Sequence, residues 1–200
     1  ALGPDKLQHG GARASGGNYE IGYSWDPSAA ALAFLRAGTQ LTVSYAVQAS
    51  DGLAQSSSQN LVFTINGTND APTLSFSQPL AIAELADASV QNIAPVRGTI
   101  TIADPDAASA PQLVTGAPVL SYTGGALTQA QTDALTAALG TGKLTFGSAS
   151  ASGASYAIGY TWDPSAAALD FLRAGSQLRV TYALQATDGG SQAPSQSLTL

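Results

Sequence analysis

The 200-residue sequence contains no cysteine and no methionine. Without cysteine, disulfide bonds and thiolate chemistry are both excluded. Extracellular domains often rely on disulfides, so an extracellular chain of this composition needs another stabilising element. Its thirteen acidic residues make an oxygen-ligated hard cation the first candidate. A cytosolic domain with a sufficient hydrophobic core explains the composition equally well. The absence of methionine also predicts that the sequence is an excerpt from a longer chain.

Positive charge is scarce as well. Lysine and arginine number seven, and the formal net charge is −6. An acidic chain without a basic cluster repels phosphate backbones, so nucleic acid is not an expected partner. No apolar run reaches the roughly 18–20 residues that span a bilayer, so we expect no membrane span.

Few residues are suited to catalysis. The chain has one histidine, His9, and a serine nucleophile would have no identifiable base. Asp26 and Asp163 each precede a proline, where N-capping explains them. No glycine-rich loop with phosphate-binding spacing follows a strand. The sequence therefore predicts a structural or binding protein and not an enzyme.

An internal repeat organises the chain. Residues 1–63 align without gaps with residues 138–200 at a constant offset of 137, and about 40 of the 63 pairs are identical. A fixed period of this kind indicates a tandem array. We therefore expect residues 1–66 to be the C-terminal part of one repeat whose head is missing. Residues 67–72 would form a linker, and 73–200 a nearly complete second repeat.

Most segments alternate between apolar and polar residues with a period of two, which is typical of antiparallel sheets with one packed face. Three other segments carry residues that start and stop helices and predict short connecting helices: 26–38, 128–140 and 163–175. Trp25 and Trp162 lie on apolar faces and are expected in the core. The expected fold is all-β, with immunoglobulin-like, cadherin-like antiparallel β-sandwich repeats. A closed barrel is the alternative.

Several motifs together carry a family resemblance. Tyr-x-x-x-Tyr-x-Trp-Asp-Pro is followed by Leu-x-Phe-Leu-x-Ala-Gly, and residues 63–72 read Phe-Thr-Ile-Asn-Gly-Thr-Asn-Asp-Ala-Pro. Glu84 and the Gly-x-Ile-x-Ile-x-Asp-Pro-Asp run at 98–106 belong to the same pattern. This combination resembles the VCBS repeat, a cadherin-like tandem module of very large bacterial RTX-type surface adhesins. The resemblance implies an extracellular, cell-surface location, frequent calcium binding, and adhesive or spacer work. The segment around 128–140 is outside the family's core pattern.

The expected sandwich topology brings acidic loops to one end of the second repeat. The chain enters at Asn69 and Asp70, the loop after the second strand carries Asp104 and Asp106, and the loop after the sixth strand carries Asp188. Four carboxylates and an amide near one point would suit calcium, which takes six to eight oxygen ligands. The alternative for each residue is ordinary turn chemistry, because Asp-Gly, Asp-Pro and Asn-Asp are turn formers.

Two further acidic residues occupy related places. Asp51 is the counterpart of Asp188 in the first copy, but its partner loops would precede residue 1, so we expect its site to be incomplete. Glu84 is expected toward the opposite end of the second repeat.

These observations favour a structural or adhesive segment of a secreted bacterial surface adhesin or fibre. Calcium at the junction would stiffen the chain, and neighbouring repeats of the same protein would be its partners. One alternative is a lectin-like module that binds cell-surface or matrix polysaccharide. Another is a fibre subunit that shares strands between chains. The chain contains one N-terminal part of a repeat, residues 73–137, and two near-identical C-terminal parts, residues 1–63 and 138–200. Either C-terminal part could pack against residues 73–137, so strand exchange between chains is a plausible route to self-association.

Overall fold

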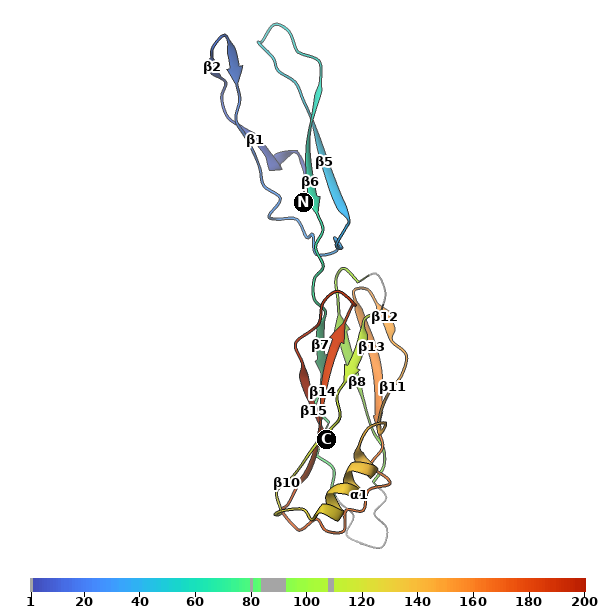
Figure 1. The fold of residues 1–200 in the computed structure, drawn as a ribbon. Helices are drawn as coiled ribbons and strands as arrows, with labels where there is room; N and C mark the ends of the chain where they lie inside the picture. The colour runs from blue at the N-terminus through green and yellow to red at the C-terminus, as the bar shows by residue number, and fades with distance from the viewer. Residues whose placement is uncertain (1, 80, 84–92, 108–109) are drawn as a thin grey trace. The chain divides into compact units, whose positions relative to one another are not determined.

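A computed structural model describes residues 2–79, 81–83, 93–107 and 110–200 (Figure 1). The chain forms two compact units, Ala1–Asn69 and Asp70–Leu200, called unit 1 and unit 2 below. The division falls inside the segment 67–72 that the sequence predicts to be a linker. In the described residues, no helix is long and apolar enough to cross a membrane.

Unit 2 consists of two antiparallel sheets. In the first sheet the strand order is β11-β13-β8-β7, and β12 also pairs with β13. In the second sheet β14 lies between β15 on one side and β9 and β10 on the other. The strands of the first sheet are β7 (Thr73–Phe76), β8 (Val96–Ala103), β11 (Leu144–Phe146), β12 (Ser150–Ser152) and β13 (Ser155–Trp162). Those of the second are β9 (Gln112–Thr115), β10 (Val119–Tyr122), β14 (Leu178–Thr187) and β15 (Gln196–Thr199).

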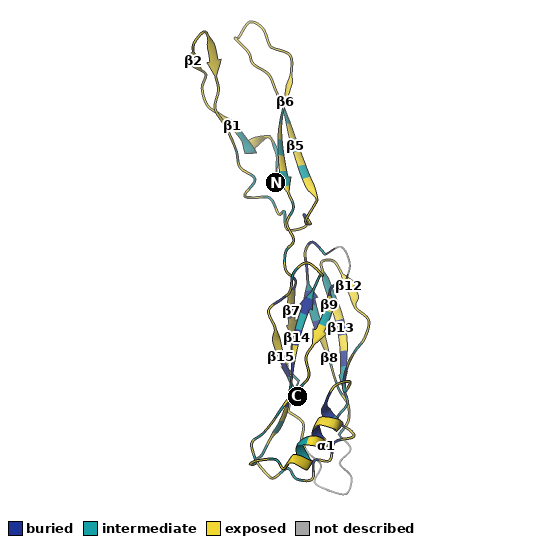
Figure 2. Cartoon of the chain, in the orientation of Figure 1, coloured by how far each residue is buried: buried dark blue, intermediate teal, exposed yellow. Residues whose placement is uncertain are grey.

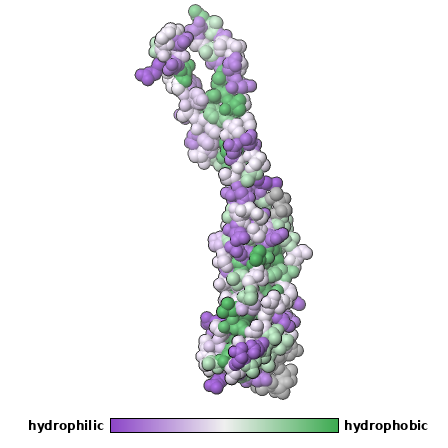
Figure 3. Space-filling model, viewed as in Figure 1, coloured by the Kyte–Doolittle hydropathy of each residue, from purple (hydrophilic) through white to green (hydrophobic). Residues whose placement is uncertain are grey.

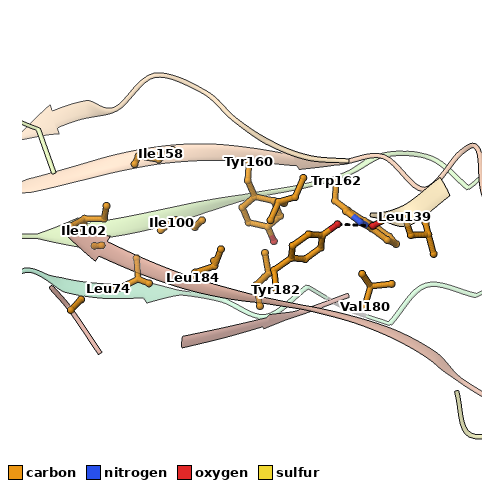
Figure 4. Close-up of a cluster of buried hydrophobic side chains, with 14 of the residues drawn as sticks. Leu74, Ile100, Ile102, Leu139, Ile158, Tyr160, Trp162, Val180, Tyr182 and Leu184 are labelled. Atoms are coloured by element: carbon orange, nitrogen blue, oxygen red, sulfur yellow. Dashed lines mark hydrogen bonds between the residues drawn. The ribbon is translucent and has the colours of Figure 1, made fainter. Parts of the chain in front are cut away.

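The core of unit 2 lies between the two sheets. Alternate residues of β8 and β13 face alternate residues of β14, and the labelled side chains of the three strands point toward one another (Figure 4). Ile100, Ile102 and Leu184 have no exposed surface. Tyr182 is also buried, and its hydroxyl donates a hydrogen bond to the carbonyl oxygen of Leu139 at 2.9 Å. The predicted all-β antiparallel sandwich is therefore confirmed, with the strands divided between two sheets.

The predicted helix at 128–140 is confirmed as α1 (Gln129–Leu139). Thr128 caps it, because its hydroxyl accepts from the backbone N–H of Gln131 while the Gln131 side chain accepts from the backbone N–H of Thr128. Leu135 and Leu139 are the buried residues of the helix.

The helix predicted over 163–175 is wrong. The segment forms three separate turns, closed by hydrogen bonds from Ala167, Leu172 and Ser176 to the carbonyl oxygens three residues earlier. Asp163 accepts from the backbone N–H of Ser165, which is a turn and not the start of a helix. The counterpart prediction over 26–38 is wrong for the same reason, since three equivalent turns occupy it.

Unit 1 reproduces the strand pairing of its counterpart in unit 2. Adding 137 to the pairs β1–β4, β2–β3 and β5–β6 gives the registers of β11–β13, β12–β13 and β14–β15. A 3-10 turn at Pro4–Lys6 precedes these strands. They are β1 (Leu7–His9), β2 (Arg13–Ser15), β3 (Asn18–Glu20), β4 (Tyr23–Trp25), β5 (Gln40–Val47) and β6 (Gln59–Asn66).

The two units differ in how far their residues are buried. Buried residues line the inner faces of the unit 2 sheets, whereas the strands of unit 1 are mostly exposed or half-buried (Figure 2). In the described part of unit 1, Leu35 is the residue classed as buried. An aromatic cluster takes the place of a core: Phe63 stacks on Trp25 with ring centroids 4.4 Å apart and meets Tyr23 and Tyr45 edge-on.

Candidate cation site

Asp104 follows the last residue of β8 and lies inside unit 2. Its side chain is 2 % exposed. Its backbone N–H donates to the carbonyl oxygen of Ala154 at 2.8 Å, which continues the pairing of β8 with β13 by one residue. The strand pairing therefore carries a carboxyl group into the protein interior at the end of the sheet.

Asp106 folds back onto Asp104. Its backbone N–H donates to Asp104 Oδ1 at 3.3 Å, and its own side chain is buried. Asp106 Oδ2 accepts a hydrogen bond from the backbone N–H of Asp70 at 3.1 Å. Because Thr73 of β7 pairs with Ala103 of β8, the first residues of unit 2 lie beside the turn that carries the two acids.

Asp188 lies in the turn after β14. Its Oδ1 atom accepts from the backbone N–H groups of Gly190 and Ser191 at 2.7 and 2.6 Å. Its charge also acts on Asp104. The structure thus brings Asp70, Asp104, Asp106 and Asp188 to the same end of unit 2, as the topology argument predicts. Asn69 is exposed and is the last residue of unit 1, so its assignment as a ligand stays a prediction.

Burial is the main cause that raises the pKa of Asp104 above its ordinary value. The side chain of Asp106 raises it further, whereas the backbone N–H of Asp106 lowers it. The negative charges of Asp106 and Asp188 add to the upward shift. The folded chain therefore resists ionisation of Asp104.

One oxygen of this group lacks a hydrogen-bond partner among the residues that the structure describes. Asp104 Oδ2 is buried and accepts no hydrogen bond from the described residues. Buried carboxylate oxygens are normally paired, because leaving one unpaired is costly. A hard cation would supply the missing partner and offset the repulsion among the carboxylates, so the donor set fits calcium. The carboxylates do not already surround a common point: the described residues contain no group of three or more His, Cys, Asp or Glu side chains arranged to hold a metal ion.

Unit 1 contains the same turn without the acidic partners. Asp51 accepts from the backbone N–H groups of Leu53 and Ala54, as Asp188 does from its own turn. The hydrogen bond from Ala54, followed by that from Leu53, lowers the pKa of Asp51. Residues 2–69 contain no counterpart of Asp104 or Asp106, so Asp51 serves as an internal reference for the turn alone. Glu84 lies outside the described residues.

Comparisons with models of known protein families, with curated proteins and with solved structures found no match. The likeness to VCBS repeats therefore stays a prediction from the motifs.

Proposed function

We propose that this chain is a tandem-repeat segment of a secreted bacterial surface adhesin or fibre, and that unit 2 binds calcium near its N-terminal end. The ligands would be Asp70, Asp104, Asp106 and Asp188, with backbone carbonyls and water completing the shell. Because Asp70 is the first residue of unit 2, the ion would order the point at which the chain enters that unit.

The buried Asp104 carboxyl group carries this proposal. A side chain that exists only to form a turn has no need to be buried with one oxygen unpaired among the described residues. Asp106 and Asp188 increase the electrostatic cost of ionising it, and a divalent cation would reverse that cost. Calcium suits the site better than magnesium because it tolerates irregular geometry and more ligands.

The repeat supports the tandem-segment part of the proposal. Unit 1 repeats the strand registers, the turns and the tyrosine hydrogen bond of residues 138–200. Tyr45 Oη donates to the carbonyl oxygens of Leu2 and Gly3 at 3.2 Å, as Tyr182 donates to that of Leu139. Modules that recur with this fidelity are typical of extended arrays. Tyr19 and Tyr23 are exposed in unit 1, whereas their counterparts in unit 2 are half-buried (Tyr156) and buried (Tyr160). This favours packing within a sandwich over sugar binding as the role of these side chains.

Calcium is expected to stabilise unit 2. For an affinity of about 10⁻⁴–10⁻³ M, as in extracellular modules, about 10 mM calcium adds about 1.4–2.7 kcal/mol to the free energy of unfolding. The measurement is urea unfolding in calcium and in chelator. Trp162 fluorescence reports on unit 2 when Trp25 is replaced by phenylalanine. Substituting Asp104→Asn or Asp188→Asn should abolish the gain.

Asp51→Asn is the matched control, because it changes the same kind of turn, and residues 2–69 contain no counterpart of Asp104 or Asp106 beside it. It should leave the calcium response of unit 2 unchanged. Equal unfolding curves in calcium and chelator for the parent chain would refute the calcium site.

The Asp104→Asn variant is expected to be more stable than the parent in chelator, and increasingly so as the pH rises. The folded-state pKa of Asp104 is raised above its unfolded value, so the folded parent holds the extra proton and loses stability as the pH rises from about 4 through that pKa. Asparagine cannot ionise and avoids this loss. Unfolding of both proteins in chelator at pH 4, 5, 6 and 7 measures the difference. A stability difference between the two proteins that does not change with pH would mean that folding does not raise the pKa of Asp104.

A further inference from the structure

Two glutamine side chains join the sheets of unit 2 along one side of the sandwich. Strand β7 is an edge strand of the first sheet, and β15 is an edge strand of the second. Gln196, the first residue of β15, donates from Nε2 to the carbonyl oxygen of Leu74 in β7. Gln78, two residues beyond the end of β7, makes two hydrogen bonds to the backbone of β15. Gln78 and Gln196 are called the glutamine clasp below.

The Gln78 side chain takes the place of a neighbouring strand. Leu200 and Val180 exchange both backbone hydrogen bonds at 3.0 Å. Hydrogen-bonded pairs alternate with non-hydrogen-bonded ones, so the backbone groups of Ser197 and Thr199 face away from β14. Gln78 Nε2 donates to the carbonyl oxygen of Ser197 at 2.7 Å, and Oε1 accepts from the backbone N–H of Thr199 at 3.0 Å. An amide that bonds two residues in this way imitates a residue of a parallel strand.

The two joined segments run in the same direction. The start of β15 contacts Leu74 in β7, and the later residues of β15 contact Gln78. Strands β7 and β15 lie next to each other in Figure 1. Strand β7 is the first strand after the linker. Strand β15 is the one by which a repeat is left, because its counterpart in unit 1, β6, leads directly into the linker. The clasp therefore joins the first strand of a repeat to the last.

Tension along an array of repeats would act on these two strands from opposite ends. It would pull β7 from its N-terminal end and β15 from its C-terminal end, so the parallel strands would have to slide past each other. Hydrophilic and hydrophobic residues are interspersed on the visible face of unit 2 (Figure 3), and a single hydrogen bond that competes with water adds little stability. In this geometry, however, the bonds of the clasp are loaded together and must break together.

We propose that the glutamine clasp is a shear lock, which limits the rate at which unit 2 unfolds when the chain is pulled along its length. This inference deepens the proposed function and rests on it in one respect, namely that a tandem segment of a surface fibre is under tension. The lock itself does not involve calcium, so it can be measured in chelator.

The test pulls the full 200-residue chain at constant force in chelator. Because the sequence contains no cysteine, Ala71→Cys and a cysteine added after Leu200 give two unique attachment points. The substitutions Gln78→Glu and Gln196→Glu together remove the two Nε2 donors and place carboxylates against backbone carbonyl oxygens. The double variant should unfold at least about tenfold faster than the parent at the same force.

Gln185→Glu is the matched control. Gln185 Nε2 donates to the carbonyl oxygen of Ala193 at 2.9 Å, so the same substitution removes the same kind of bond, from β14 to the segment that precedes β15. This bond does not join β7 to β15. The variant should change the unfolding rate along the chain by less than about threefold.

A second pulling direction separates a shear lock from a general stabilising contact. Gly116→Cys and Gln192→Cys place both attachment points on the second sheet, since Gly116 bonds to Ala183 of β14 and Gln192 bridges to Thr187. The load then does not pass from β7 to β15. The double glutamine variant should unfold at the rate of the parent, within about threefold.

Three results would overturn the proposal. They are an unchanged rate along the chain, an equal acceleration in both pulling directions, and an equal acceleration by Gln185→Glu. None of them would affect the calcium site, which is tested by unfolding in calcium and chelator without force. Conversely, a calcium response that is absent while the clasp variant behaves as expected would remove the calcium site and leave the lock in place.

Discussion

Replacing Ile158 with alanine is expected to lower the free energy of unfolding of unit 2 by about 2–5 kcal/mol. Ile158 points from β13 into the core and is 5 % exposed. Alanine removes buried methyl and methylene groups and leaves a cavity among side chains from both sheets. The slowest-exchanging amides of β14 report the global opening of this unit and provide the measurement.

The Ile21→Ala variant is the matched control. It makes the same substitution at the equivalent repeat position, where the side chain is 50 % exposed, and it should cost unit 1 less than about 1 kcal/mol. The slowest amides of β5 report that loss. If both variants lost the same stability, the contrast in burial between the units would be absent in solution.

This pair of positions shows what a repeated sequence does and does not determine. The turns, strand registers and tyrosine hydrogen bond recur in unit 1 because they depend on residues within the repeated segment. Ile158 packs in a core that also contains residues of β8, and β8 lies outside that segment. The repeated segment therefore determines the turns and the strand pairs, whereas the complete two-sheet sandwich also requires residues from 73–137.

The long strands could be predicted from alternation alone. Residues 156–162 and 178–186 alternate over several consecutive positions and form β13 and β14. Alternation does not predict strands β9 and β10, in which no residue is fully buried. The helix prediction over 163–175 is wrong because an Asp-Pro dipeptide can begin a turn as well as a helix, and at 163–164 it begins a turn.

The candidate site could be predicted in part. Strand order alone brings Asp104, Asp106 and Asp188 to one end, since two loops and the start of β7 meet there. Sequence could not predict that Asp104 is buried with one oxygen unpaired among the described residues, while Asp188 is already engaged by its own turn. Asp104 is carried into the interior because the pairing of β8 with β13 continues for one more residue, through the hydrogen bond from Asp104 to Ala154.

Replacing Gly98 with valine is expected to destabilise unit 2 by about 3 kcal/mol. Gly98 lies in the middle of β8, where glycine is ordinarily unfavourable, and the ring of Tyr160 covers it. Tyr160 is 3 % exposed and cannot move aside without disturbing the core. Urea unfolding followed by Trp162 fluorescence, with Trp25 replaced by phenylalanine, provides the measurement.

The Gly159→Val variant controls for adding a branched side chain to this sheet. A Cβ atom there meets no atom within 4 Å, so the change should stay within about 0.5 kcal/mol. Combining Gly98→Val with Tyr160→Ala tests the cause directly. If the clash is with the ring, the double variant should be at least about 1 kcal/mol more stable than the sum of the single losses predicts. Strict additivity would mean that Gly98 is required for a reason other than Tyr160.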